Sequence, residues 1–385
     1  MLSQALPGVC YTSIASHRLQ TMNRPSALHR LIELIRNEWH QLTAITPSNR
    51  RWQMPFAAAL ASGLPLMVGA YFGHLDYGLI SSLGGLVFLY QPHTPLSHRM
   101  TWLMVCGFGM SACYTLRAIA HFLPLTKAGM LGFIAVLVTM VCRFYRIGPP
   151  GSLFFVMAAA IAAYTPGTVD DIPLRVGLLT MGALLASLIA FFYSLYILRL
   201  QAPDAVAPLP PASFDFVVFD SIVIGAFVGL SLAVAQALQL DRPYWVPISC
   251  LAVIQGVSVR AVWNRQIHRV LGTAVGMLLA WGIIALPLSP WGIAVMVIVL
   301  AFIIETTVVR HYGFAVIFIT PLTILLAEAP TLGHLPAAEL LQSRFIDTVL
   351  GCLMGLIGGI CLHNARFRDT LGRQLRKLTP SRLQP

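Results

Sequence analysis

The chain has 385 residues, of which 57% are hydrophobic and only 10% are charged. Too few polar side chains are present to cover a soluble globule of this length, so the composition excludes a soluble protein and indicates a polytopic membrane protein. The formal net charge of +11 does not indicate nucleic-acid binding, because the arginines are distributed between apolar stretches rather than gathered on one polar domain.

The first segment of the chain, residues 1–53, is expected to be a cytoplasmic N-terminal region. Within it, residues 25–43 place apolar side chains on one face of a helix and charged side chains mostly on the other. This pattern predicts an amphipathic helix that lies in the plane of the membrane interface. No charged region followed by an apolar run marks a cleavable signal peptide.

Twelve apolar segments follow, in two groups of six that are separated by a proline-rich break at 201–212. The sequence therefore predicts an all-α membrane protein with a first six-span unit at 54–200, a second at 213–363 and a basic cytoplasmic tail at 364–385. The predicted segments are 54–72, 77–91, 100–122, 128–142, 151–164 and 176–198, then 216–238, 244–257, 270–287, 291–306, 312–327 and 345–363.

The distribution of basic residues predicts the orientation of these segments. With both termini in the cytoplasm, twenty of the 25 Lys and Arg residues lie on the cytoplasmic side. Such an excess is what the positive-inside rule requires, so we expect both termini in the cytoplasm. The five that remain on the opposite side are Arg117, Lys127, Arg175, Arg242 and Arg344.

The two groups of segments resemble each other in residues and in spacing. A six-span unit used twice, with both copies entering the membrane from the same side, predicts parallel repeats related by an axis along the membrane normal. The matching pairs are Leu75-Asp76 with Leu240-Asp241, His98-Arg99 with His268-Arg269, Arg146 with Arg310, and Arg175 before Gly182 with Arg344 before Gly351.

The second and fifth segments of each group are too short to cross a membrane straight, since a full crossing needs about 20 residues. They are the segments 77–91, 151–164, 244–257 and 312–327, and each is interrupted or preceded by Gly or Pro. Short, interrupted segments at matching positions indicate a central binding site in a transporter. The alternative is that they are tilted or partly re-entrant structural helices.

A basic residue runs into a glycine-spaced apolar helix at Arg269-x-x-Gly272-Thr273-x-x-Gly276. These positions share one face of a helix, and we expect that face to begin at the membrane border. One interpretation is an arginine that reaches for the interface above a seam of small packing residues. The other is an anion contact on a translocation path.

These residues resemble a known family. The Arg-x-x-Gly-Thr-x-x-Gly segment, the Asp-Arg-Pro-Tyr-Trp turn at 241–245 and the spacing of Arg344 to Gly351 are similar to the fusaric-acid-resistance-like (FUSC) family. That family is related to bacterial aromatic acid exporters and to plant aluminium-activated malate transporters. The resemblance implies inner-membrane export of small, often aromatic, carboxylates, by a homodimer or beside a periplasmic adaptor protein.

For an anionic substrate, the arginines are the natural carboxylate contacts, because a guanidinium offers two parallel donors. Trp245 could stack on an aromatic ring, although an aromatic residue near a border is also a common interface anchor. The predicted substrate-binding residues are Arg269, Gly272, Thr273, Arg344, Arg99, Arg175 and Trp245.

Proton coupling would need titratable groups at membrane depth, and the candidates are Asp220, Asp347 and Glu305. For Asp220 the alternatives are a proton relay and a cross-helix salt bridge. Asp347 lies three residues after Arg344 on one helix face, so the two could neutralise each other. Glu305 is expected to pair with Arg310 at the interface.

No nucleotide-binding, hydrolase or metal-binding motif is present, so we expect neither an enzyme nor a cofactor. The seven cysteines lie mostly in apolar segments, and we expect small core residues without disulfides. The leading hypothesis is a proton-coupled secondary exporter of small organic anions. The alternatives are a passive anion channel or uniporter, and an accessory membrane subunit that transports nothing itself.

Overall fold

The computed structural model describes residues 43–120, 127–165, 167–206, 213–328 and 337–378, together with residues 36 and 208. The chain separates into two compact units, residues 1–44 and residues 45–385. The amphipathic helix predicted at 25–43 lies, apart from residues 36 and 43, outside the described residues. The helices from residue 53 onward all belong to the second unit.

The described secondary structure of this unit is helical throughout, as the sequence predicts. The first group of segments corresponds to α2 (Gln53–Tyr71), α3 (Leu75–Gly85) with the 3-10 helix η1 (Leu86–Tyr90), α4 (Leu96–Ala120), α5 (Lys127–Phe144), α6 (Leu153–Ala162) and α7 (Asp171–Ile197). The second group corresponds to η3 (Asp215–Phe219), which is a π-helical turn, α8 (Asp220–Ala237), α9 (Trp245–Ile254), α10 (Val259–Ile284), α11 (Pro290–Thr307), α12 (Tyr312–Glu328) and α13 (Ala337–His363).

Eight of the described helices are long and apolar enough to cross a membrane, and four shorter apolar helices occupy the second and fifth places of the two groups. The prediction of a polytopic helical membrane protein with short segments at these places is therefore confirmed. Large apolar side chains on the long helices point away from the protein: Phe108 is 78% exposed, Leu278 72% and Met181 64%. Such side chains suit contact with lipid.

Two helices begin much earlier than their predicted spans. α10 begins at Val259 instead of residue 270, and its first turn is capped by Ser258, whose hydroxyl accepts a hydrogen bond from the Ala261 amide at 3.2 Å. α13 begins at Ala337 instead of residue 345. The early turns of both helices are polar or amphipathic, so they add length without adding to the apolar run. Arg269 and Arg344 therefore lie inside helices.

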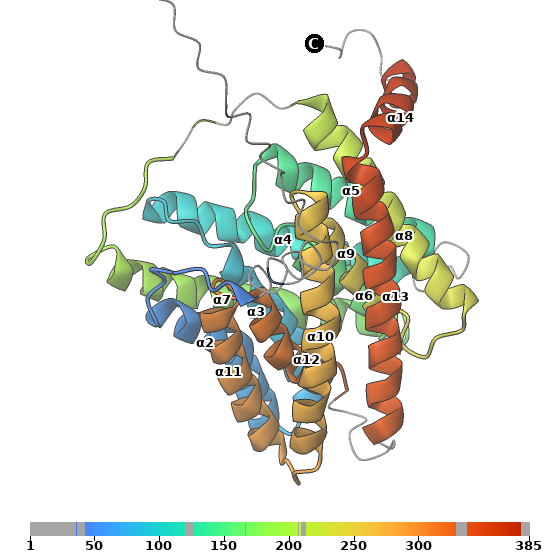
Figure 1. Ribbon diagram of the computed structural model, residues 1–385. Coiled ribbons are helices and arrows are strands. Elements are labelled where there is room, and N and C mark those ends of the chain that lie inside the picture. Colours follow the sequence, from blue (N-terminus) through green and yellow to red (C-terminus); the bar gives the residue numbers. More distant parts are fainter. Residues whose placement is uncertain are drawn as a thin grey trace, which may run out of the picture. The chain divides into compact units, whose positions relative to one another are not determined.

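The basic tail is also helical. α14 (Ala365–Leu378) follows directly on α13, and the Asn364 side chain accepts a hydrogen bond from the Phe367 amide at its start. Figure 1 shows α13 and α14 in red, with α13 beside α8 and α10. Phe367 packs against Phe219, with ring centroids 6.5 Å apart, so α14 contacts the start of the second group of helices.

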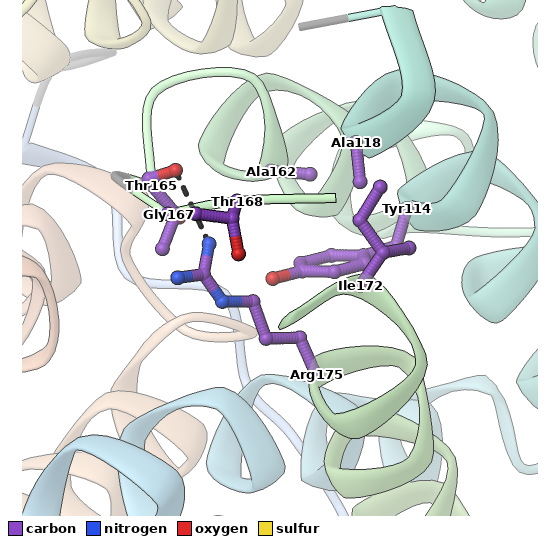
Figure 2. A pocket seen from close by; sticks show the side chains of 8 residues that line it. All are labelled: Tyr114, Ala118, Ala162, Thr165, Gly167, Thr168, Ile172 and Arg175. Carbon is purple, nitrogen blue, oxygen red and sulfur yellow. Dashed lines mark hydrogen bonds between the residues drawn. The ribbon is translucent and has the colours of Figure 1, made fainter. Parts of the chain in front are cut away.

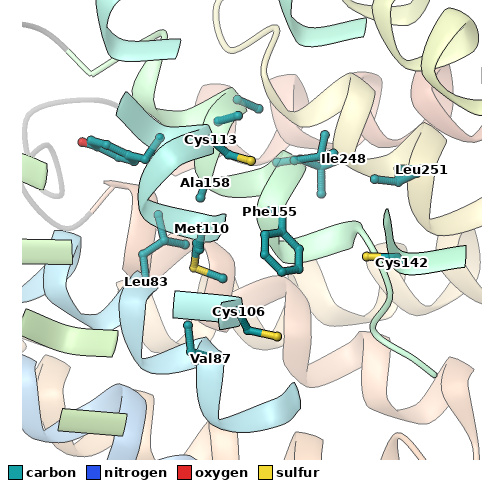
Figure 3. Packing of buried hydrophobic residues seen from close by; sticks show 14 of the residues in the cluster. Leu83, Val87, Cys106, Met110, Cys113, Cys142, Phe155, Ala158, Ile248 and Leu251 are labelled. Carbon is teal, nitrogen blue, oxygen red and sulfur yellow. The ribbon is translucent and has the colours of Figure 1, made fainter. Parts of the chain in front are cut away.

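The same pairs of positions are in contact in both groups. The second helix contacts the sixth, α3 with α7 and α9 with α13, and the third contacts the fifth, α4 with α6 and α10 with α12. Between the groups, α5 packs against α8 and α2 packs against α11. One hydrophobic core contains residues of both groups, so the proline-rich linker does not divide two separately packed cores. Figure 3 shows part of this core, where Phe155 and Ala158 of α6 lie among residues of α3, α4, α5 and α9.

Cysteines are core residues, as predicted. The described cysteines are free thiols, and Cys106, Cys113 and Cys142 belong to the shared core. Cys250 and Cys352 are buried as well. Desolvated thiols of this kind behave as small apolar side chains that fill space between helices.

Glycines allow the close helix contacts. A Cβ atom at Gly351 would overlap the carbonyl oxygen of Val246 on α9, and a Cβ at Gly182 would overlap that of Ser81 on α3. At Gly355 it would lie 2.7 Å from the carbonyl oxygen of Cys250. The glycine stripe of α13 is thus used for packing within the chain.

Candidate anion-binding site

Arg269 lies ten residues after the start of α10, about 15 Å along the helix axis. Its side chain is buried, with 6% of the residue exposed. Its described partners are two neutral hydroxyl groups. Nη2 donates to Ser249 Oγ at 3.4 Å and Nη1 to the Tyr312 hydroxyl at 3.5 Å, while Nε has no partner among the described residues. No described acidic side chain lies within ion-pair distance of this guanidinium.

Arg344, on α13, is a second buried cation, with 4% of the residue exposed. Its Nη2 donates to Thr323 Oγ1 at 3.3 Å, and its guanidinium carbon lies 3.8 Å from the centre of the Trp245 ring. Trp245 itself is only 3% exposed. The interpretation of Trp245 as an interface anchor is therefore wrong, because the indole is buried and forms a cation–π contact.

The helices that carry Arg269 and Arg344 pack together, α13 against α9 and α10, and α10 against α12, so both arginines belong to one region between α9, α10, α12 and α13. We call this region the four-helix site. Among the described acidic side chains of these helices, Asp347 is buried and Glu339 is exposed. Buried positive charge surrounded by apolar packing attracts an anion strongly, because little solvent screens it.

Gly272 and Thr273 of the predicted motif form a packing seam. A Cβ at Gly272 would lie 2.8 Å from the carbonyl oxygen of Gly313, and a Cβ at Gly276 would lie 2.8 Å from the Cβ of Thr320. Thr273 is buried as well. The small residues therefore bring α10 and α12 together, and this contact places Tyr312 beside Arg269.

The two arginines predicted in the first group have their described contacts with residues of that group. Arg99 Nε donates to the Thr94 carbonyl oxygen at 2.5 Å, and Nη1 to Ser194 Oγ at 3.4 Å. Arg175 Nη1 donates to the Thr165 carbonyl oxygen at 3.2 Å, and Nη2 lies 3.7 Å from Asp171 Oδ2. Their roles as substrate contacts remain predictions.

Arg175 also lines a small pocket between α4 and the loop that precedes α7. Figure 2 shows its guanidinium beside the Tyr114 ring and under Thr165 and Gly167. The cavity holds about 10 Å³, which is room for a single water molecule. An organic anion does not fit into this pocket unless the loop moves.

The three acidic candidates have different surroundings. Of the two alternatives for Asp220, the structure contains the cross-helix salt bridge. Its Oδ2 lies 2.8 Å from Arg143 Nη1 and its Oδ1 lies 2.7 Å from Arg368 Nη1. Glu305 pairs with Arg50 at 3.1 Å, so the expected pairing with Arg310 is wrong. Asp347 is buried in the four-helix site, with 1% of the residue exposed.

Arg117 is a buried charge that was not among the site residues predicted from the sequence. This arginine lies inside the predicted segment 100–122, near the end of α4, and is completely buried. The rule that selected Asp220, a charge inside an apolar span, would also have selected Arg117.

Comparison with known proteins places the four-helix site in a family context. The profile of a family described as fusaric acid resistance protein-like matches residues 230–358. The matched region contains Trp245, Ser249, Arg269 and Arg344, so the four-helix site lies inside the fusaric acid resistance protein-like region.

Two curated proteins are similar to the chain. It is 20% identical over 458 aligned positions to the uncharacterized membrane protein YvaC of Bacillus subtilis (strain 168). This alignment covers 81% of this chain and 72% of that protein. It is 25% identical over 140 positions to the uncharacterized protein YhfK of Escherichia coli (strain K12). This alignment covers 36% of this chain and 19% of that protein. No solved structure matches the chain.

Proposed function

We propose that this membrane protein is a secondary transporter that exports small organic anions, aromatic carboxylates in particular, across the inner membrane. The observation that supports this most is the state of Arg269. It is a buried cation inside the family region, and its described contacts are long hydrogen bonds to the neutral hydroxyls of Ser249 and Tyr312.

The chemistry of a guanidinium supports a carboxylate ligand. Hydrogen bonds from N–H to oxygen are normally 2.7 to 3.2 Å long, and charge-assisted bonds to a carboxylate are about twice as strong as neutral ones. The contacts of Arg269, at 3.4 and 3.5 Å, are therefore weak ones that a carboxylate can replace. Arg344 and the Trp245 ring, on neighbouring helices of the same site, supply a second cation and an aromatic surface.

For proton coupling we propose Asp347 ahead of the other two acids. Asp220, on α8, and Glu305, on α11, lie on helices outside the four-helix site. Asp347 lies within the four-helix site, one helical turn from Arg344. A carboxyl group here could exchange a proton as the anion arrives or leaves, which would link the two movements.

The test is transport by purified protein in proteoliposomes, with radiolabelled benzoate and an imposed pH gradient. Arg269→Gln should reduce gradient-dependent uptake at least tenfold, because it removes the charge but keeps a polar side chain. Arg199→Gln, at an exposed arginine past the end of α7, is the matched control and should keep wild-type flux.

Other outcomes favour other functions. Benzoate movement that does not depend on the pH gradient, and that Asp347→Asn leaves unchanged, would support a passive channel or uniporter. Wild-type protein that moves no carboxylate at all would support an accessory subunit. Equal flux in Arg269→Gln and wild type would remove Arg269 from the substrate path.

A further inference from the structure

Arg117 is a buried cation in the other half of the chain. It is on α4, none of its surface is exposed, and it is the largest side chain among the fully buried ones that the structure describes. None of its three guanidinium nitrogens has a hydrogen-bond partner in the described part of the chain. No described acid forms an ion pair with it. A guanidinium has five donors, so this arrangement leaves an unusual amount of donor capacity unused.

The surroundings of Arg117 are basic and aromatic. Tyr164 lies just past the end of α6, a helix that packs against α4. The ammonium of Lys127 lies over the same tyrosine ring, 5.5 Å from its centre. Arg175 lies near this end of α4 in the fold. Tyr114, one helical turn before Arg117, lines the same small pocket as Arg175 (Figure 2).

An aromatic path connects this cluster to the four-helix site. The Tyr164 ring lies 5.7 Å from the Tyr244 ring, which lies 5.1 Å from the Trp245 ring. Trp245 in turn stacks on Arg344. The hydroxyl of Tyr164 also accepts a hydrogen bond from Gln236 of α8 at 2.7 Å. The contacts therefore run from Tyr164 of the first half, across the junction of the halves, to Arg344, a buried cation of the second.

A buried charge without a partner is costly, and proteins keep such groups mainly where a ligand completes them. A neutral side chain of similar shape would fill the same space on α4 at a lower cost. The basic surroundings make an anion the ligand that offsets this cost, and the five donors of a guanidinium suit a carboxylate.

We infer that Arg117 binds the carboxylate group of the transported anion at a second position, at the first-half end of this aromatic path. This inference rests on the proposed function for the class of ligand. Arg269 and Arg344 form one carboxylate position and Arg117 forms the other, with Tyr164, Tyr244 and Trp245 between them.

The test is the amount of radiolabelled benzoate bound at saturation to purified protein in nanodiscs, in a chloride-free buffer. Wild type should bind one molecule per chain more than Arg117→Met does. The methionine keeps an unbranched side chain of similar length without the charge. Arg199→Gln should bind as much as wild type. The unfolding temperature of ligand-free Arg117→Met, which should equal or exceed that of wild type, shows that the variant is folded.

The outcomes separate this inference from the proposed function. Equal benzoate binding by Arg117→Met and wild type would overturn the inference, whatever Arg269→Gln does to flux. Loss of one bound molecule in Arg117→Met, combined with normal flux and binding in Arg269→Gln, would support the site at Arg117 and reject the four-helix site. Wild type that binds no benzoate would overturn both.

Discussion

Arg50 and Glu305 lie 3.1 Å apart, Nη1 to Oε2, although 255 residues separate them in the chain. The pair joins the start of α2 to the end of α11. A second contact between the two groups of helices, α5 with α8, has a similar pair, Arg143 with Asp220 at 2.8 Å. In both pairs the cation belongs to the first half and the acid to the second, so the halves are electrostatically complementary where they meet.

Glu305→Gln should therefore destabilise the folded protein. The loss should be about 1–3 kcal/mol, because the Arg50 side chain is 30% exposed and that of Glu305 only 14%, so the pair lies between a surface and a buried ion pair. The double variant Arg50→Glu with Glu305→Arg restores opposite charges and should recover part of the loss. Unfolding by SDS in mixed micelles measures both. A Glu305→Gln variant as stable as wild type would contradict this role.

Asp220 should be more important for stability than either of its partners. It pairs with Arg143 of α5 and with Arg368 of α14, so Asp220→Asn weakens two contacts and leaves two arginines without the acid. Arg368→Gln weakens one, at a side chain that is 31% exposed. We expect Asp220→Asn to cost about 2–4 kcal/mol and Arg368→Gln about 1 kcal/mol or less. The same SDS titration orders the variants, and an equal loss in both would show that α14 supplies the main contact.

The sequence predicted the short helices well and the ion pairs poorly, for different reasons. Gly and Pro interrupt secondary structure at their own positions in the chain. Short segments such as the one that contains α9 can therefore be recognised from the sequence alone. Glu305 has Arg310 nearby in sequence, but its partner comes from a helix that only the tertiary structure brings close. The start of α10 was misjudged because its first turns are polar, although Ser258 was a readable N-cap signal.

The glycines of α13 should tolerate no side chain where they face α9. Gly351→Ala would drive a Cβ into the carbonyl oxygen of Val246, and backbone atoms cannot turn away as a flexible side chain can. A destabilisation of about 1–3 kcal/mol is typical of such overpacking. Gly177→Ala on α7 is the matched control, since its Cβ would meet nothing within 4 Å. It should be neutral or slightly stabilising, because alanine favours a helix. Equal thermal stability of the two variants would disprove the close α9–α13 contact.

The hydroxyls that hold Arg269 should tune transport more than stability. Ser249 Oγ and the Tyr312 hydroxyl accept its two described hydrogen bonds, both long. Ser249→Ala frees one arm of the guanidinium, and loss of a hydrogen bond worth about 0.5–1.5 kcal/mol should change the KM for benzoate roughly two- to tenfold. Ser187→Ala is the matched control, because that serine bonds only within its own helix, to the Ala183 carbonyl oxygen at 2.9 Å.

The decisive comparison repeats Ser249→Ala in the Arg269→Gln background. If the serine acts through the guanidinium, the second substitution should have no further effect on the residual flux, because residues that act as a unit are not additive. If Ser249 instead supports the packing of α9, both backgrounds should lose stability equally in the SDS titration while KM stays constant. A KM change of the same size in both backgrounds would place Ser249 in direct contact with the anion, independent of Arg269.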